Sequence, residues 1–160
     1  MPTLYMMIGL PASGKSTFRK TMSGQILSTD DYIHEYAKEH NTTYMGIFKE
    51  AAPAAETKMN DDLLFAVENN WDIVWDQTNL TKKARAKKLA KIPKTYRKVA
   101  IYVACPESSV WRQRLDDRKD QQIPSHVLAS MAKQMEFPTR SEGFDEIQVV
   151  VNGAIERNWA

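Results

Sequence analysis

The chain has 160 residues, of which 42% are hydrophobic and 26% are charged, and its net charge at neutral pH is +2. These values are typical of a globular protein that folds as one domain over residues 1–160, and they exclude a disordered chain and a coiled coil. Cys105 is the only cysteine, so no intrachain disulfide can form. No apolar run approaches the roughly 20 residues needed to cross a bilayer, so we expect a cytoplasmic protein without membrane contact.

Short apolar runs alternate along the chain with helical patterns. The run at residues 4–8 ends at a glycine and predicts a buried strand, and Gly24 ends a helix that begins inside the glycine-rich loop. In chain order, the patterns predict strands at 4–8, 25–29, 72–76, 97–103 and 146–151, and helices from the glycine loop to about 22, and at 31–40, 47–70, 81–93, 107–118 and 125–135. This alternation predicts an α/β fold, a three-layer sandwich with a central parallel sheet flanked by helices.

Gly9 to Ser16 match the pattern G-x-x-x-x-G-K-[ST], directly between a predicted strand and a predicted helix. Successive backbone N–H groups there can surround the β-phosphate of a nucleotide at the helix N-terminus. We expect Lys15 to reach the β- and γ-phosphates and the Ser16 hydroxyl to help hold Mg²⁺, with ATP as the nucleotide. A chance match in a surface loop is the alternative. The nucleotide-binding residues predicted from this loop are Gly9, Pro11, Ala12, Ser13, Gly14, Lys15, Ser16 and Thr17.

Two carboxylates follow other predicted strands. Asp76 ends one strand and can bind the metal directly or through water, although a helix cap or turn residue is the alternative. Asp30 follows another strand and can accept the proton of an attacking hydroxyl, or it caps the helix that follows. Ligands of parallel sheets bind at the carboxyl ends of the strands, so we expect Gly9, Asp30 and Asp76 in one neighbourhood.

Arginines recur on the helix predicted at 107–118. Arg114 and Arg118 are four residues apart and therefore share a face. Either could neutralise charge on a transferring phosphoryl group. The alternative is a solvated stripe that pairs with Asp116, Asp117 and Asp120.

Residues 82–98 include nine basic residues and no acidic one, which leaves the rest of the chain with a net charge of −7. Such a segment can contact the phosphates of a polynucleotide. A solvated helix face is the alternative.

Four segments in this order carry a resemblance to a known family: residues 9–17, 28–32 (STDDY), 76–80 (DQTNL) and 114–131. Together they resemble the kinase domain of bacteriophage polynucleotide 5′-hydroxyl kinases, over nearly the whole chain. The resemblance implies that Asp30 is the general base and that Arg118, with Arg114 nearby, is the arginine of a lid over the donor phosphates. It also implies that Asp76 is the acidic residue of the third strand and that Thr78 and Asn79 lie in the acceptor cleft.

The resemblance implies transfer of the γ-phosphate of ATP to the 5′-hydroxyl of DNA or RNA, with Mg²⁺, in nucleic acid repair. One position departs from it: enzymes of this family that repair RNA have an arginine after the Asp-Asp-Tyr segment, where this chain has Ile33. A kinase for a small hydroxyl acceptor (a nucleoside, sugar or antibiotic) is therefore the main alternative. A second alternative, of another class, is an ATPase switch that phosphorylates nothing. The sequence makes no prediction of oligomeric state.

Overall fold

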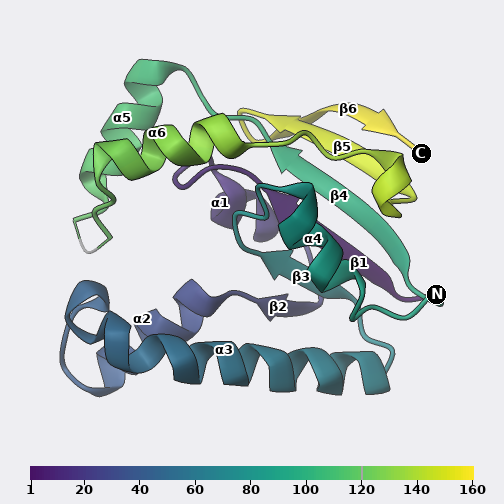
Figure 1. Cartoon of the computed structure of the whole chain (residues 1–160), viewed down its shortest axis with the longest axis horizontal. Coiled ribbons are helices and arrows are strands. Elements are labelled where there is room, and N and C mark those ends of the chain that lie inside the picture. Colours follow the sequence, from purple (N-terminus) through teal and green to yellow (C-terminus); the bar gives the residue numbers. More distant parts are fainter. Residues whose placement is uncertain (120) are drawn as a thin grey trace.

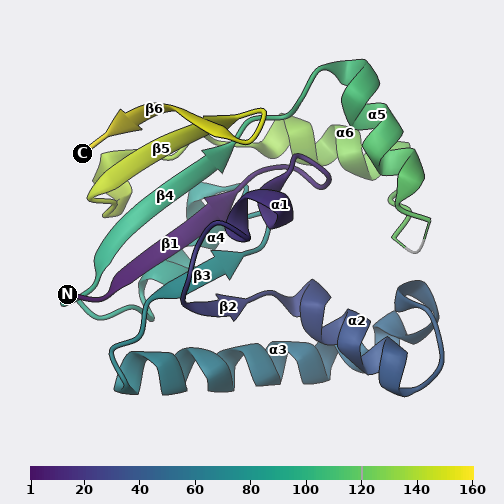
Figure 2. The same cartoon turned by 180° about the vertical axis from the view of Figure 1, so that it is seen from behind.

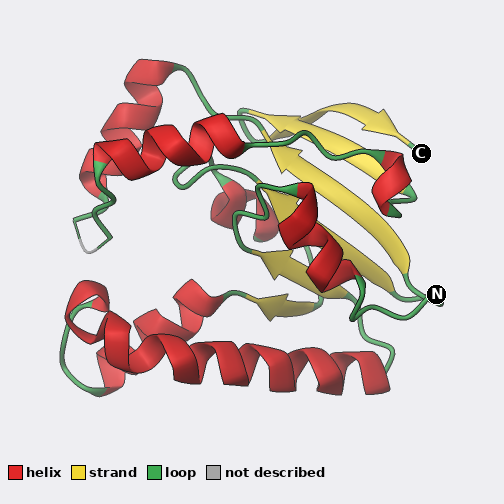
Figure 3. Cartoon of the chain, in the orientation of Figure 1, coloured by secondary structure: helices red, strands yellow, loops and turns green. Residues whose placement is uncertain are grey.

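The computed structural model describes residues 1–119 and 121–160. Its strands are β1 (Thr3–Ile8), β2 (Gln25–Leu27), β3 (Ile73–Asp76), β4 (Arg97–Val103), β5 (Glu146–Val151) and β6 (Ala154–Trp159). They form one sheet in the order β2–β3–β1–β4–β5–β6 (Figures 1 and 3). All neighbouring pairs are parallel except β5 and β6, which are antiparallel. The predicted α/β fold with a mostly parallel central sheet is confirmed.

Helices cover both faces of this sheet. They are α1 (Lys15–Arg19), α2 (Thr29–Glu39), α3 (Tyr44–Glu68), α4 (Lys82–Leu89), α5 (Ser108–Asp117) and α6 (Ser125–Gln134), with a 3-10 helix at Arg140–Glu142. The α4 helix lies on the face seen in Figure 1, α1 lies on the opposite face seen in Figure 2, and α3 runs along the β2 edge. Among the described residues, no helix combines the length and the apolarity needed to cross a membrane.

The β1 strand shows why the sheet is buried on both sides. Leu4, Met6 and Ile8 belong to a core cluster that includes side chains of α3 and α4. Met7, which points to the other face, packs in a second cluster with Phe18 of α1. A strand covered on both faces reads as a continuous apolar run, which is the pattern that predicted it.

The sixth strand was not predicted. All residues of β6 are exposed, so this strand has no buried face to produce an alternating pattern. The turn before it, Asn152-Gly153, has φ angles of 49° and 82°. Asn-Gly is the preferred pair for a two-residue hairpin turn, and it was the available signal for an antiparallel strand after β5.

Two helix starts also differ from the expectation. The α3 helix begins at Tyr44, where the Thr43 hydroxyl caps it by accepting from Gly46 N, rather than at residue 47. The α2 helix begins at Thr29, and its cap is Ser28, whose Oγ accepts from Asp31 N. Asp30 is therefore not the cap of α2, and its carboxylate is available for another contact.

Arg85 is one of the nine basic residues of segment 82–98, yet its side chain is 0% exposed. Its Nε donates to Glu142 at 2.8 Å, and its Nη1 donates to the carbonyl oxygens of Asn79, Leu80 and Glu136. Burial would raise the pKa of Glu142, but hydrogen bonds from Arg85 and a neighbouring backbone amide hold it below its ordinary value. Arg85 thus ties α4 to the loop after β3 and to the chain after α6.

We predict that Arg85→Ala lowers the free energy of unfolding by about 3–5 kcal/mol, because removing one partner of a buried ion pair leaves the other uncompensated. Lys87→Ala, an exposed change on the same helix, is the control and should shift it by no more than about 0.5 kcal/mol. Urea denaturation of both variants measures the difference. Equal stabilities would contradict an internal role for Arg85.

Candidate active site

A cleft of about 1100 Å³ lies at the carboxyl ends of β1, β2 and β3. Its lining comes from the loop between β1 and α1, the first turns of α2 and α3, the end of β3, and the segment of α5 and α6. Eleven predicted site residues line it: Pro11, Ala12, Gly14, Lys15, Ser16, Thr17, Asp30, Asp76, Thr78, Arg114 and Arg118. The structure therefore brings together residues that are far apart in sequence.

The loop from Gly9 to Gly14 has a conformation that its glycines permit. Gly14 has a φ of 109°, in the left-handed region that favours glycine. A Cβ at Gly9 would lie 2.9 Å from the carbonyl oxygen of Val103, so no side chain fits there. Among the described residues, the buried Ser13 Oγ has no hydrogen-bond partner. A buried polar atom without a partner calls for one, and an oxygen of a bound phosphate would satisfy it.

Lys15 is buried at the base of this loop. Its Nζ donates to the carbonyl oxygens of Gly9 at 2.9 Å and of Leu10 at 2.8 Å. Burial lowers the pKa of Lys15 to about 8, although the negative charge of Asp76 opposes the shift. The lysine therefore lies beside the loop with its charge only weakly compensated, which suits an anionic ligand.

Asp76 lies beside Ser16 and beside a residue that the sequence did not indicate, Arg19. The Ser16 hydroxyl donates to Asp76 Oδ2 at 3.1 Å, and Arg19 Nη1 donates to the same oxygen at 2.8 Å. Arg19 Nη2 also pairs with Asp31 Oδ2 at 2.6 Å. Burial raises the pKa of Asp76, against the charges of Lys15 and Arg19. The sequence feature that could have indicated Arg19 is its spacing: it follows Ser16 by three residues, and residues three apart on a helix are neighbours on one face.

Ser16 and Asp76 fit the ligands expected for Mg²⁺ bound to a nucleotide. In the described part of the chain, no group of three or more His, Cys, Asp or Glu side chains could hold a metal ion by itself. Mg²⁺ is usually held by one or two protein oxygens together with phosphates and water, so a hydroxyl and one carboxylate suffice.

Asp30 lies in the first turn of α2, where it lines the cleft. The hydroxyl of Tyr44, the first residue of α3, donates to Asp30 Oδ1 at 2.6 Å. The Tyr44 ring packs against His34 at 4.8 Å and against Phe48 at 5.6 Å, centroid to centroid. Phe48 and Met45 line the same side of the cleft although they are 44% and 56% exposed. Sequence reasoning missed this wall because it arises from the packing of α3 against α2, and the predicted helix start at residue 47 also left out Tyr44 and Met45.

The α5 and α6 helices, together called the lid, have no buried residues. Trp111 Nε1 donates to Pro11 O at 2.8 Å, and Arg114 Nη1 donates to Ser13 O at 3.3 Å. Arg118 Nη2 donates to Gln121 Oε1 at 2.9 Å. The lid thus rests on the loop between β1 and α1.

The alternative of a solvated arginine stripe is met in part, because Arg112 and Arg114 are exposed. The pairing that it included is not seen: among the described residues, neither Arg114 nor Arg118 has a carboxylate within ion-pair distance, Asp116 and Asp117 included. Asp120, the third carboxylate of that alternative, lies outside the described residues.

Asn79 lies elsewhere than expected. It is 2% exposed, its Nδ2 donates to Met7 O at 2.7 Å, and its Oδ1 accepts from the Lys88 ammonium. Asn79 therefore fixes the loop after β3 and does not line the cleft, whereas Thr78 lines it and accepts from Gly9 N through its carbonyl oxygen. No residue of the basic segment 82–98 lines the cleft either.

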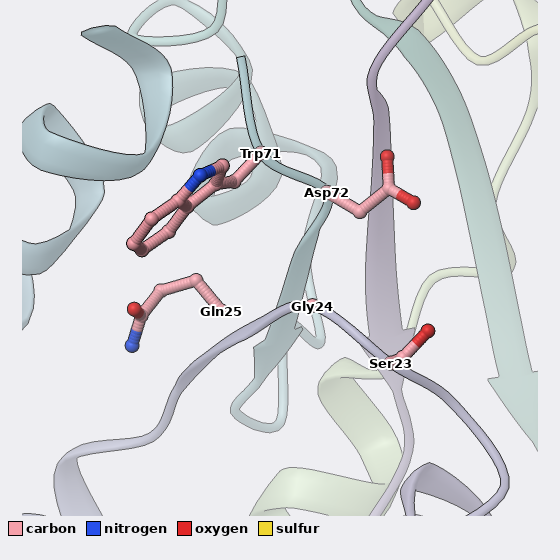
Figure 4. A pocket seen from close by; sticks show the side chains of 5 residues that line it. All are labelled: Ser23, Gly24, Gln25, Trp71 and Asp72. Carbon is pink, nitrogen blue, oxygen red and sulfur yellow. The ribbon is translucent and has the colours of Figure 1, made fainter. Parts of the chain in front are cut away.

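A second, shallower hollow of about 330 Å³ lies at the amino ends of β2 and β3. In Figure 4 the Trp71 ring and the Gln25 side chain lie on one side of it, and the Asp72 carboxylate points towards β1. Asp72 Oδ1 accepts from Thr3 N at 2.8 Å, so this carboxylate is bonded to the first residue of β1. None of the predicted site residues lies here.

Comparison with known proteins gives a family match and several structures of similar fold. The model of the family described as AAA domain matches residues 4–138. A putative kinase from Chloroflexus aurantiacus superposes with a TM-score of 0.67 at 14% identity, covering 95% of this chain and 86% of that one. A structure from the PezAT toxin-antitoxin system of Streptococcus pneumoniae has a TM-score of 0.70 at 13% identity, covering 99% of this chain and 71% of that one. A sugar kinase from Janibacter has a TM-score of 0.60 at 13% identity, covering 94% of this chain and 86% of that one. At such identities these structures share the fold.

We predict that affinity for ADP falls as the pH rises above about 8. Phosphates raise the pKa of Lys15 in the complex, so binding above pH 8 must take up a proton, and affinity decreases by up to about tenfold per pH unit. Calorimetric titration with ADP between pH 7 and 9.5 measures this. Lys15→Arg is the control, since a guanidinium stays protonated and its binding should not vary over this range. A wild-type affinity that is constant to pH 9.5 would contradict the prediction.

Proposed function

The chain belongs to the AAA domain family, and from this premise we propose that it is an ATP-dependent P-loop kinase that phosphorylates a hydroxyl group. The loop of residues 9–16 is called the P-loop. One observation carries the proposal: a single cleft is lined by the P-loop lysine, by two carboxylates, and by two arginines (Lys15, Asp30, Asp76, Arg114 and Arg118). The P-loop alone would suit any nucleotide-binding protein. An ATPase switch would leave Asp30, which lines the same cleft, without a catalytic role.

The donor half of the cleft is assigned to ATP. The backbone N–H groups of the loop and Ser13 Oγ bind phosphate oxygens, and Lys15 pairs with the β- and γ-phosphates. Ser16 and Asp76 would hold Mg²⁺, which would supply positive charge against the phosphates. Arg114 and Arg118 lie on the lid side, where a guanidinium can offset charge that develops on the transferring group.

The acceptor half is assigned to the hydroxyl that attacks. Its oxygen forms a bond to the γ-phosphorus, the bond from that phosphorus to the β–γ bridging oxygen breaks, and ADP leaves. Asp30 accepts the proton of the hydroxyl and orients it for attack.

A small hydroxyl compound is the acceptor that these features favour. The basic segment 82–98 stays outside the cleft, and Ile33 stands where RNA-repairing relatives of the resembled family have an arginine. The wall of Tyr44, Phe48 and Met45 is largely apolar, so it suits an acceptor that carries a ring better than it suits a highly charged strand. One of the similar structures is a sugar kinase, which is consistent with a small acceptor.

The 5′-hydroxyl end of DNA or RNA is the second candidate. The order and composition of the segments 28–32, 76–80 and 114–131 support it, because a P-loop alone would not require them. A salt-dependent affinity for oligonucleotides would accompany this function.

We predict transfer of labelled γ-phosphate from Mg-ATP to at least one acceptor in a panel of nucleosides, sugars, aminoglycosides and 5′-hydroxyl oligonucleotides. Asp30→Asn should lower kcat by about 10²- to 10⁴-fold, because a general base is lost, and should leave ATP affinity within about threefold. Glu35→Gln, an exposed carboxylate of the same helix, is the control and should behave as the wild type.

The outcomes separate the candidates. Labelling of a small compound but not of the oligonucleotide supports the first, and preferential labelling of the oligonucleotide supports the second. ATP turnover that is indifferent to every acceptor and to Asp30→Asn would overturn both.

A further inference from the structure

We propose that Tyr44 is a positioning residue for phosphoryl transfer, and that its hydroxyl holds one oxygen of Asp30 so that the other oxygen is presented to the acceptor hydroxyl. This inference rests on the proposed function, in which Asp30 is the base. Nothing in the P-loop or lid motifs indicates Tyr44, which enters the site through the packing of α3 against α2.

The first step is that Tyr44 is itself held in place. It is buried in the cluster that joins α2 and α3, together with Ile33 and Ile47. Its ring contacts the rings of His34 and Phe48. The ring of Tyr44 therefore has little freedom to move.

The second step concerns the carboxylate. The torsion that rotates a carboxylate of aspartate is broad, with no sharp staggered minima. The 2.6 Å hydrogen bond from Tyr44 to Asp30 Oδ1 selects one orientation of this otherwise soft group. Catalytic groups must be held to within roughly 0.5 Å and 10–20° of the productive geometry. A fixed hydrogen-bond donor on one carboxylate oxygen also fixes the position of the other oxygen.

The third step is that the donor is permanent. Burial, followed by the hydrogen bond to Asp30, raises the pKa of Tyr44 well above its ordinary value. The phenol therefore keeps its proton throughout the pH range of a kinase assay, and it cannot itself serve as the base.

The same pair of helices supplies matched controls. Tyr32 and Tyr36 of α2 also donate to carboxylates of α3, Tyr32 to Asp62 and Tyr36 to Glu50 at 3.5 Å. Neither of these two tyrosines nor their carboxylates line the cleft, in contrast to Tyr44 and Asp30. Removing each hydroxyl in turn therefore separates a loss of helix packing from a loss of base orientation.

The experiment compares Tyr44→Phe with Tyr32→Phe and Tyr36→Phe, using Mg-ATP and whichever acceptor the wild type phosphorylates. We expect Tyr44→Phe to lower kcat about 10- to 100-fold, as misplacement of a catalytic group by about 1 Å does, with the KM for ATP unchanged. The two controls should retain kcat within about twofold. Thermal unfolding of all three variants establishes that each is folded at the assay temperature.

A double variant tests whether Tyr44 acts through Asp30. In the Asp30→Ala background, adding Tyr44→Phe should leave the residual single-turnover rate unchanged, because its target is already gone. Independent, multiplicative losses would overturn the assignment, as would a Tyr44→Phe enzyme with wild-type kcat. If the wild type phosphorylates no acceptor, the proposed function itself fails, and this assignment fails with it; an active wild type with an indifferent Tyr44→Phe sinks the Tyr44 assignment alone.

Discussion

The parallel pairing of β1 with β3 is the constraint on which the site depends. In this register Met7 lies opposite Asp76, so the two strands end at nearly the same level. The loop that leaves β1 therefore meets the carboxylate that ends β3, and Ser16 reaches Asp76 Oδ2 at 3.1 Å. A shift of one residue would turn the side chain of Asp76 to the other face of the sheet. The backbone hydrogen bond from Gly9 N to Thr78 O further fixes the loop to the end of β3.

Charge in this region is arranged in a chain that runs away from the P-loop. Arg19 bridges the nearly buried Asp76 and the exposed Asp31, and so links the end of β3 to the first turn of α2. A buried carboxylate costs free energy unless it is paired, and Arg19 supplies the pair while leaving Lys15 bonded to loop carbonyls. The lysine is thus kept available for phosphates, and the metal-binding carboxylate of the proposal is held near the serine that would share the metal with it.

Much of the fold and of the site could be predicted from the sequence. The residues that were not predicted, or were placed wrongly, have physical reasons in common. The P-loop follows β1 directly, Asp76 ends β3, and Asp30 lies three residues after β2, so local pattern and the rule for parallel sheets were enough to place them together. Tyr44 and Phe48 could not be placed, because their role arises from the packing of one helix against another and not from a strand end. Asn79 belongs to a recognisable segment, yet motif membership does not say which way a side chain points.

Burial also decides between readings of the same charge. The run 82–98 looks uniform in sequence, but Arg85 is internal and bonded to Glu142, and burial lowers the pKa of Lys88 to about 8 where it approaches Trp75. Composition records the charges and not their surroundings, so a count of basic residues overstates the charge that this face presents to a partner. Only the exposed members of the segment remain to attract phosphate.

The lid adds a link between the two halves of the cleft. Gln121 Oε1 accepts from Arg118, which belongs to the donor side, and also pairs with His34 Nε2 at 3.1 Å, which belongs to the acceptor side. Neither lid helix buries a residue fully, and the polar contacts of Trp111 and Arg114 with the P-loop connect the lid to the rest of the chain. One amide oxygen thus joins Arg118, which the proposal assigns to the donor phosphates, to His34 of α2, the helix that also carries Asp30.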